Sequence, residues 1–149
     1  MSGDGRSGSA SQALAEACAA GLLAKDAASR HLGLTLESVG PGAACVSVTV
    51  EPQMLNGLDV CHGGFIFALA DTAMAYASNS RNRPALAQTC QVTFLAPARG
   101  GDRLTATARE TAAAGRTGIH DVEVCNQDGK LLAVFRGQTR TVEGEIVTE

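Results

Sequence analysis

The chain is poor in aromatic residues: among its 149 residues are four Phe, one Tyr and no Trp. Proteins that bind single-stranded nucleic acid stack its bases on aromatic side chains, and a formal net charge of −3 has the wrong sign for a phosphate backbone. We therefore expect no nucleic-acid partner. Hydrophobic residues make up 45% of the chain, which suffices for a globular core built mainly from Ala, Val and Leu.

The chain also lacks paired cysteines and long apolar runs. Its five cysteines lie far apart, without a C-x-x-C pair, which argues against a disulfide framework and a zinc site, so no metal is expected. The longest apolar stretches are interrupted by Glu16 and Asp71, and neither reaches the length that spans a membrane. Residues 1–10 are polar and do not have the order of a signal peptide. These features predict a cytoplasmic protein with no membrane partner.

The alternation of strand-like runs with turn signals predicts an α+β fold. Residues 1–10 are expected to be a disordered tail, and residues 11–149 a single domain that begins with a helix over 11–26. Six strand-like runs follow, at 34–40, 44–51, 86–95, 104–112, 119–125 and 131–141. Strands joined by such short connections must pair antiparallel, because a parallel pair needs a long crossover.

Between the second and third strands lies a segment that is apolar on every face of a helix, from Phe65 to Ser80. A helix of this kind is buried on all sides. In a chain of this length, only a curved sheet could cover it. The predicted architecture is therefore one curved antiparallel sheet wrapped around one long central helix.

Asp71 interrupts this apolar helix near its middle. The residues three and four positions away are apolar on both sides, namely Phe67, Ala68, Met74 and Ala75. An ionised carboxylate there is costly without partners, and burial would raise its pKa. A lone Asp at helical spacing is more often one that leaves the core and pairs with an arginine. The apolar residues on both sides favour a functional carboxylate instead.

The tripeptide His62-Gly63-Gly64 precedes the same helix. Two glycines at a helix start leave its first N–H groups uncovered at the positive end of the helix dipole. This arrangement suits a polarised carbonyl group or a developing oxyanion. From the tripeptide alone, a tight turn that needs flexible residues is the better explanation.

The spacing of Gly63 and Asp71 links the two features. Eight positions separate them, which is roughly 12 Å along a helix axis. A base and the donors of an oxyanion hole must both come within about 3 Å of one carbonyl group, so one subunit cannot supply both. Two antiparallel helices related by a two-fold axis could place Gly63 of one chain against Asp71 of the other. If both belong to one site, the protein is at least a dimer.

A resemblance to a known family rests on four segments in this order: Leu55-Asn56-Gly57, Cys61-His62-Gly63-Gly64, Leu69-Ala70-Asp71-Thr72-Ala73 and Thr93-Phe94-Leu95-Ala96-Pro97. Together they closely resemble the hotdog-fold thioesterases, and most of all the PaaI-type enzymes of phenylacetate degradation. The resemblance covers residues 34–142 and implies the hotdog fold. It also implies hydrolysis of an acyl-CoA thioester to free CoA and a carboxylic acid. An aryl-acetyl-CoA such as hydroxyphenylacetyl-CoA is the expected substrate, and a homotetramer of two homodimers the expected assembly.

The resemblance also assigns roles to single residues. Asp71 matches the catalytic carboxylate, which acts as nucleophile or as general base on water. Gly63 matches the residue whose backbone N–H polarises the thioester carbonyl from the opposite subunit, and Gly64 is expected to bind substrate beside it. Asn56 matches a loop amide that orients water or holds the leaving group, and His62 is expected to brace the loop rather than transfer protons. No cofactor is expected, because the CoA thioester is the substrate.

Coenzyme A carries phosphates, so basic residues are expected where it enters the site. Arg116 is the first candidate because glycine residues flank it in its turn. The other candidates are Arg81, Arg83, Arg136 and Arg140. His31 and His120 have no ligand spacing and are expected to be ordinary surface or strand histidines.

Two other functions stay open. A hotdog-fold hydratase would act through a catalytic His on a different motif, which is not found in this sequence. A non-catalytic acyl-CoA binding or regulatory module would not need a carboxylate in an apolar helix, so Asp71 distinguishes it from an enzyme. One position departs from the family: Ala87 stands where some relatives have a Ser that could assist water.

Overall fold

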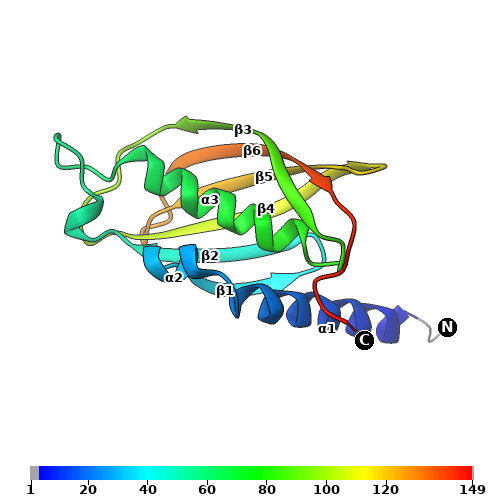
Figure 1. Ribbon diagram of the computed structural model, residues 1–149. Coiled ribbons are helices and arrows are strands. Elements are labelled where there is room, and N and C mark those ends of the chain that lie inside the picture. Colours follow the sequence, from blue (N-terminus) through cyan, green and yellow to red (C-terminus); the bar gives the residue numbers. More distant parts are fainter. Residues whose placement is uncertain (1–3, 149) are drawn as a thin grey trace.

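Six antiparallel strands form one curved sheet that holds the long helix α3 against its inner face (Figure 1). The computed structural model describes residues 4–148. In chain order, the elements are α1 (Asp4–Leu23), α2 (Ala27–Leu32), β1 (Thr35–Gly40), β2 (Ala43–Thr49), the 3-10 helix η1 (Pro52–Met54), α3 (Gly63–Ser78), β3 (Ala85–Phe94), β4 (Arg103–Ala114), β5 (Thr117–Cys125) and β6 (Leu131–Thr141).

The sheet has the strand order β1-β2-β4-β5-β6-β3, with every neighbouring pair antiparallel. The β4–β5 and β5–β6 hairpins turn at Gly115 and Gly129, whose φ angles are 58° and 75°. Glycine adopts such positive angles without strain. The predicted α+β class, with a curved antiparallel sheet around one long helix, is confirmed.

The N-terminal region differs from its prediction. Helix α1 begins at Asp4, so the disordered tail expected over residues 1–10 is wrong for residues 4–10; residues 1–3 lie outside the described part. Ser11 lies inside this helix and not at its start. Its hydroxyl donates a hydrogen bond to the carbonyl of Ser7, one turn earlier, at 3.0 Å. None of the helices in residues 4–148 is long and apolar enough to cross a membrane.

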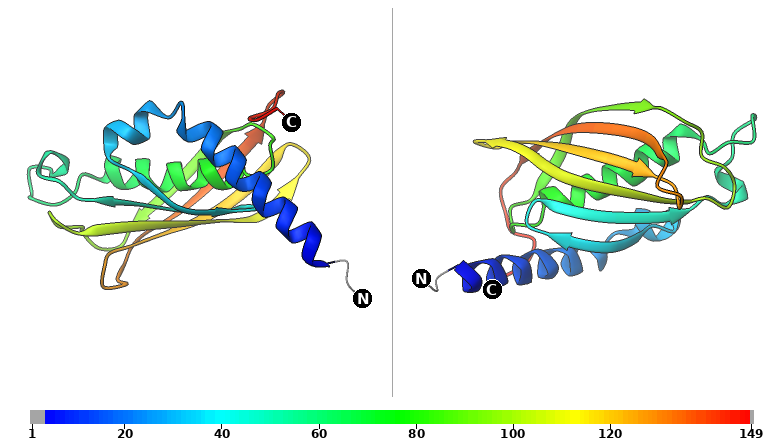
Figure 2. Two further views of the ribbon diagram at one scale, coloured as in Figure 1. Left: turned by 90° about the horizontal axis from the view of Figure 1, so that it is seen from below. Right: turned by 180° about the vertical axis from the view of Figure 1, so that it is seen from behind.

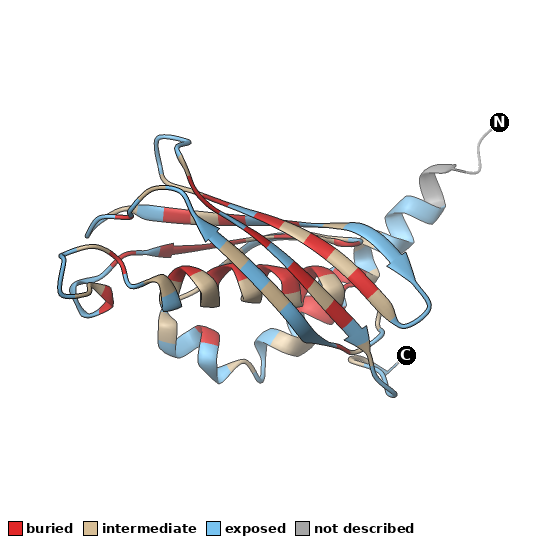
Figure 3. Cartoon of the chain, turned by 90° about the horizontal axis from the view of Figure 1, so that it is seen from above, coloured by how far each residue is buried: buried red, intermediate tan, exposed pale blue. Residues whose placement is uncertain are grey.

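Helix α3 packs one side onto the sheet. Its buried residues recur at helical spacing and are Ile66, Leu69, Ala70, Ala73, Met74, Tyr76 and Ala77. They share one core with inward-facing strand residues such as Val46, Leu104 and Val122 (Figure 3). A second stripe of α3, formed by Ala68, Asp71, Thr72 and Ala75, is only half-buried. The expectation of a helix buried on all sides is therefore wrong for the single chain, because the sheet covers only one side of it.

The two edges of the sheet differ in how they are covered. Helix α1 contacts β1 at one edge and runs beside that edge in the right view of Figure 2. At the other edge is β3, whose ten residues pair with β6 on one side and with no strand of residues 4–148 on the other. Its side chains Leu86 and Phe94 are exposed. A long, uncovered edge strand of this kind is a template for pairing with another chain.

Asp26 ties α2 to the core. Its carboxylate caps α2 by accepting a hydrogen bond from the backbone N–H of Ser29 at 3.0 Å, and it also accepts one from the Tyr76 hydroxyl at 2.9 Å. Burial by itself would raise the pKa of Asp26, but the hydrogen bonds from Ser29 and Tyr76 and the charge of Arg30 together lower it. The ionised carboxylate therefore stabilises the fold.

Asp26→Ala should lower the free energy of unfolding by about 1–2 kcal/mol at neutral pH, as expected for a lost helix cap. The pKa of Asp26 is lower in the folded state than in the unfolded state, so its contribution is present above the unfolded value of 3.8 and is lost as the pH falls through the folded value. Urea denaturation of both proteins at pH 7 and in acid measures this. Tyr76→Phe keeps the cap and should cost less. A difference between wild type and Asp26→Ala that stayed constant into acid would contradict the assignment.

Candidate functional site

Asp71 lies in the middle of α3, in the half-buried stripe that the sheet does not cover. Within residues 4–148 its carboxylate has neither an ion pair nor a hydrogen-bond donor, and burial raises its pKa. The arginine partner of the simpler interpretation is thus not found in this part of the chain. Burial also raises the pKa of the Cys90 thiol on β3, and the nearby charge of Asp71 raises it further. The carboxylate therefore lies between α3 and the edge strand, poorly solvated and without a partner.

The start of α3 leaves one backbone donor free. His62 is the N-cap residue, and its ring Nδ1 accepts a hydrogen bond from the N–H of Gly64 at 2.9 Å. The next N–H, from Phe65, donates to the carbonyl of His62 at 3.0 Å. No acceptor among the described residues takes the N–H of Gly63. Of the first three donors of this helix, that of Gly63 can polarise a bound carbonyl group, whereas that of Gly64 is already occupied.

His62 therefore holds the loop and the helix start together, while its role in the reaction stays a prediction. Its backbone N–H donates to the carbonyl of Met54 at 2.8 Å, which ties the helix start to η1. Because Nδ1 accepts from Gly64, the proton of the neutral ring lies on Nε2. The role of Gly64 in binding substrate stays a prediction. Its N–H cannot take part in this arrangement, because it already donates to His62.

Asn56 organises the loop before α3. Its side-chain oxygen accepts hydrogen bonds from the N–H groups of Leu58 at 2.9 Å and Val60 at 3.3 Å, and its own N–H donates to the carbonyl of Val60 at 2.8 Å. Its side-chain NH₂ group has no acceptor in residues 4–148. The oxygen thus fixes the loop, while the NH₂ group stays available to donate to water or to a leaving group.

An apolar cavity of about 460 Å³ opens beside Gly63. Its walls come from the helix start, the preceding loop and the segment after β3, with Ile66, Phe94, Leu95 and Pro97 among them. The ring of Phe94 lies so close to Gly63 that a Cβ atom added there would approach Phe94 Cζ to 2.9 Å. Asp71 does not line this cavity. Within one chain, the free donor and the free carboxylate therefore do not meet, as their spacing along the helix predicts.

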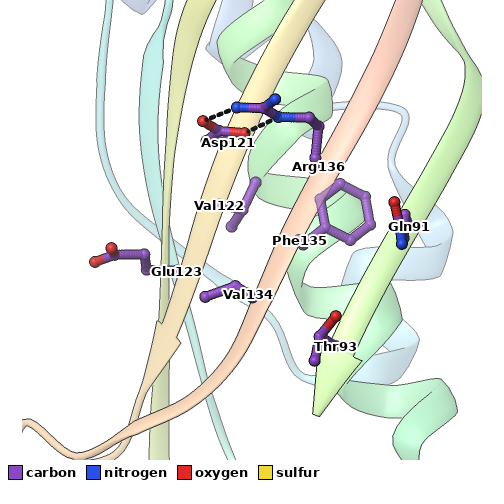
Figure 4. A pocket seen from close by; sticks show the side chains of 8 residues that line it. All are labelled: Gln91, Thr93, Asp121, Val122, Glu123, Val134, Phe135 and Arg136. Carbon is purple, nitrogen blue, oxygen red and sulfur yellow. Dashed lines mark hydrogen bonds and ion pairs between the residues drawn. The ribbon is translucent and has the colours of Figure 1, made fainter. Parts of the chain in front are cut away.

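Arg136 occupies the opposite face of the sheet from α3. Its guanidinium donates two hydrogen bonds to Asp121, at 2.6 and 2.7 Å, beside a hollow of about 360 Å³ (Figure 4). The hydrogen bond from Arg136 lowers the pKa of Asp121. Because two of the three guanidinium nitrogens of Arg136 donate to Asp121 and Asp71 lies on the other side of the sheet, Arg136 is a poor candidate for binding CoA phosphates.

Arg116 lies in the turn between β4 and β5, where it lines a hollow of about 230 Å³ together with Arg81 and Arg83. Three of the five candidate arginines thus gather at one place, at the C-terminal end of α3. The same hollow is lined by His120 of β5, a residue that sequence reasoning took for an ordinary strand histidine. His120 is 1% exposed. Its inward direction follows from the alternation that also buries Val122 and Val124.

Comparison with known proteins identifies the family of the chain. Residues 58–133 match the thioesterase superfamily. The chain is 46% identical over 124 residues to the acyl-coenzyme A thioesterase PaaI of Escherichia coli. The aligned region covers 83% of this chain and 89% of the relative.

Two solved structures extend the comparison. The PaaI protein of the E. coli phenylacetic acid degradation operon superposes with a TM-score of 0.88 at 42% identity, over 90% of this chain and 97% of that one. The smu.793 protein of Streptococcus mutans bound to acetyl CoA superposes with a TM-score of 0.72 at 25% identity, over 75% of this chain and 90% of that one.

Proposed function

Because the chain belongs to the thioesterase superfamily, we propose that it hydrolyses aryl-acetyl-CoA thioesters such as hydroxyphenylacetyl-CoA. It is an acyl-CoA thioesterase of the PaaI type with the hotdog fold. The observation that supports an aryl-acetyl group is the apolar cavity beside the free N–H of Gly63, which the ring of Phe94 lines. Such a cavity can hold a flat apolar ring next to the polarised carbonyl group. The origin of the E. coli PaaI structure, a phenylacetic acid degradation operon, points to the same substrates.

The proposed reaction uses two groups, the N–H of Gly63 and the carboxylate of Asp71, that have no partner in the part of the chain that the structure describes. The N–H of Gly63 donates to the thioester oxygen and stabilises the oxyanion that forms. Asp71 either takes a proton from the attacking water or attacks the carbonyl carbon itself. The C–S bond then breaks, the CoA thiolate leaves, and the carboxylic acid is released after one water has been consumed. The NH₂ group of Asn56 orients the water or holds the leaving group.

We also propose that a second copy of the chain completes each site. Antiparallel pairing of β3 with β3 of another copy would continue the sheet and cover the exposed edge. The same two-fold axis would bring two α3 helices together over their first halves, from Gly63 to Asp71, where Ala68 allows close approach. Gly63 of one subunit would then face Asp71 of the other. Two such dimers would form the homotetramer that the family resemblance implies.

The proposed location is the cytoplasm. All five cysteines have free thiols in the structure, and the cytoplasm keeps thiols reduced.

A panel of CoA thioesters tests the proposed substrate class. Phenylacetyl-, hydroxyphenylacetyl-, benzoyl- and straight-chain acyl-CoA esters would be compared by the rate of free thiol release. We expect the highest kcat/KM for the two aryl-acetyl esters, by about tenfold over a straight chain of similar size, since a well-fitted apolar group contributes roughly 1–3 kcal/mol to discrimination.

The cavity offers a matched variant for this panel. Phe94→Leu should reduce the preference for aryl-acetyl esters and leave hydrolysis of the straight-chain esters close to wild type. A wild-type enzyme that prefers straight chains would contradict the aryl-acetyl proposal. Binding of the esters without any release of thiol would favour the acyl-CoA binding module instead.

A further inference from the structure

A basic hollow lies at the C-terminal end of α3, outside the proposed catalytic groups. We use this name for the cavity of about 230 Å³ whose polar lining includes Arg81, Arg83, Glu110, Arg116, His120 and Thr139. Its walls come from the segment after α3, from the β4–β5 hairpin and from β6. The volume is smaller than the roughly 300–1,000 Å³ of pockets that enclose drug-sized ligands. A single compact group fits it better than a whole nucleotide.

His120 forms the buried part of the wall. Its side chain is 1% exposed, and neither ring nitrogen has a hydrogen-bond partner among residues 4–148. The nearest acidic group is Glu110, whose Oε2 lies 3.7 Å from Nε2, beyond hydrogen-bond distance. A buried polar group without a partner costs free energy, so such an atom calls for an explanation. A polar group bound in the hollow would give the ring a partner.

The charges that line the hollow do not cancel. Arg81 donates to both carboxylate oxygens of Glu110 at 3.2 Å. Arg83 and Arg116 have no ion pair within residues 4–148. Burial lowers the pKa of His120, which keeps the ring neutral at neutral pH. Three guanidinium groups against one carboxylate leave two positive charges, which matches the charge of about −1.5 to −2 on a phosphate monoester at pH 7.

The hollow connects to Asp71 along α3. Asp71, Ala75 and Ser78 follow one another at spacings of four and three residues, so they lie on one stripe of the helix. All three are half-buried, and Ser78 lines the hollow. Seven residues correspond to roughly 10 Å along the axis. The long pantetheine arm that joins the thioester of an acyl-CoA to its phosphates could follow this stripe.

We propose that the basic hollow binds a phosphate monoester, and that this group is the 3′-phosphate of the CoA substrate. Arg83 and Arg116 pair with the phosphate oxygens, Arg81 contributes from its pair with Glu110, and His120 closes the hollow beneath the group. The identification with CoA rests on the proposed thioesterase function. A free phosphate ion has the same chemistry and is the other source that the experiment distinguishes.

The first experiment compares one acyl group on CoA and on 3′-dephospho-CoA. Wild type should have a KM about tenfold lower for the CoA ester, as expected for one charge-assisted hydrogen-bonded pair. Arg83→Gln and Arg116→Gln should each raise the KM for the CoA ester much more than the KM for the dephospho ester, and so remove most of this difference.

Arg109→Gln is the matched control, because Arg109 is exposed beside Glu110 on β4 and does not line the hollow. An equal KM of wild type for both esters would overturn the 3′-phosphate assignment, as would an equal rise for both esters in the variants. If Arg109→Gln raised the KM for the CoA ester by the same amount, the assignment would also be overturned, since the loss of any nearby positive charge would then explain the effect.

The second experiment measures binding without turnover. Isothermal titration of wild type and Arg116→Gln with CoA, 3′-dephospho-CoA and inorganic phosphate separates the two sources. Tighter binding of CoA than of dephospho-CoA, lost in Arg116→Gln, supports the proposal even if no thioester is hydrolysed; the proposed function would then fail alone.

The remaining outcomes overturn part or all of the proposal. Equal binding of both CoA forms together with Arg116-dependent binding of phosphate overturns the assignment to CoA and identifies a free-phosphate site. Binding that does not depend on Arg116 overturns the site itself. The ring ¹H–¹⁵N NMR signals of His120 should shift when CoA binds, and unchanged signals would overturn the placement of the phosphate over this ring.

Discussion

Asp71→Asn should lower kcat by about 10²–10⁴-fold, the loss expected when a general base or nucleophile is removed. The amide has almost the same shape as the carboxylate, and no residue of the described chain donates a hydrogen bond to Asp71. Folding and thioester binding should therefore stay intact. Steady-state hydrolysis of phenylacetyl-CoA, together with a titration of bound CoA, separates the loss of turnover from a loss of affinity. A kcat equal to that of wild type would refute the catalytic assignment.

The pH dependence gives an independent view of the same carboxylate. Asp71 must be ionised to act as base or nucleophile, so kcat/KM should rise with pH through the pKa of this group. Burial raises that pKa above its ordinary value of 3.8. The acidic limb of the pH–rate profile should therefore lie at a higher pH than an ordinary Asp would give. The residual activity of Asp71→Asn should lack this limb.

The raised pKa of Asp71 also has a consequence for stability. The folded state holds the proton of Asp71 more tightly than the unfolded state does, so the favourable contribution is fully present below pH 3.8 and is lost as the pH rises through the folded value. At neutral pH, the ionised group therefore destabilises the fold. Asp71→Asn should melt at a higher temperature than wild type at pH 7, and the difference should shrink in acid. An enzyme that gains stability when it loses a carboxylate has retained that carboxylate for its function.

The sheet could be predicted from the sequence because local patterns determine it. Alternating residues such as Val46, Val48 and Val50 identify the face that packs against α3, and glycine-containing turns identify the hairpins. The first helix was placed too late because composition suggested a tail, whereas the helix hydrogen bonds continue back to Asp4. Burial of the central helix was overestimated, because hydropathy reports how apolar a helix is and does not tell which chain covers it.

The site could be predicted only in part, for a similar physical reason. Asp71 stood out because a carboxylate conflicts with its apolar surroundings, whereas the role of Gly63 came from the family resemblance. The ring of His62, however, takes up the N–H of Gly64 rather than that of Gly63, and this depends on side-chain geometry that a spacing does not specify. The gathering of Arg81 with Arg116, 35 positions later in the chain, depends on how β4 and β5 turn back over the end of α3.

Mixing two inactive variants should restore activity if the site is shared between subunits. Gly63→Val would force side-chain atoms into the ring of Phe94, because even a Cβ atom at this position comes within 2.9 Å of it. The helix start must then shift and carry the oxyanion donor away. Alone, this variant should lose about 10²–10³-fold in kcat, as for other oxyanion donors.

In a dimer of one Gly63→Val chain and one Asp71→Asn chain, both lesions fall in the same site and the other site is intact. Random exchange of subunits should therefore restore about a quarter of the wild-type activity. Circular dichroism and sedimentation of each variant alone verify that both still fold and assemble.

The double variant Gly63→Val/Asp71→Asn provides the reciprocal test. In a mixed dimer with wild type, each of the two shared sites receives one lesion, so that only pure wild-type dimers are active. An equal mixture should retain about a quarter of the activity of wild type at the same total concentration. If each chain had its own complete site, the same mixture would retain about half, and mixing the two single variants would restore nothing. A shared site therefore raises the activity of the first mixture and lowers that of the second. Both outcomes test the one feature on which the mechanism depends, namely that Gly63 and Asp71 of a working site come from different chains.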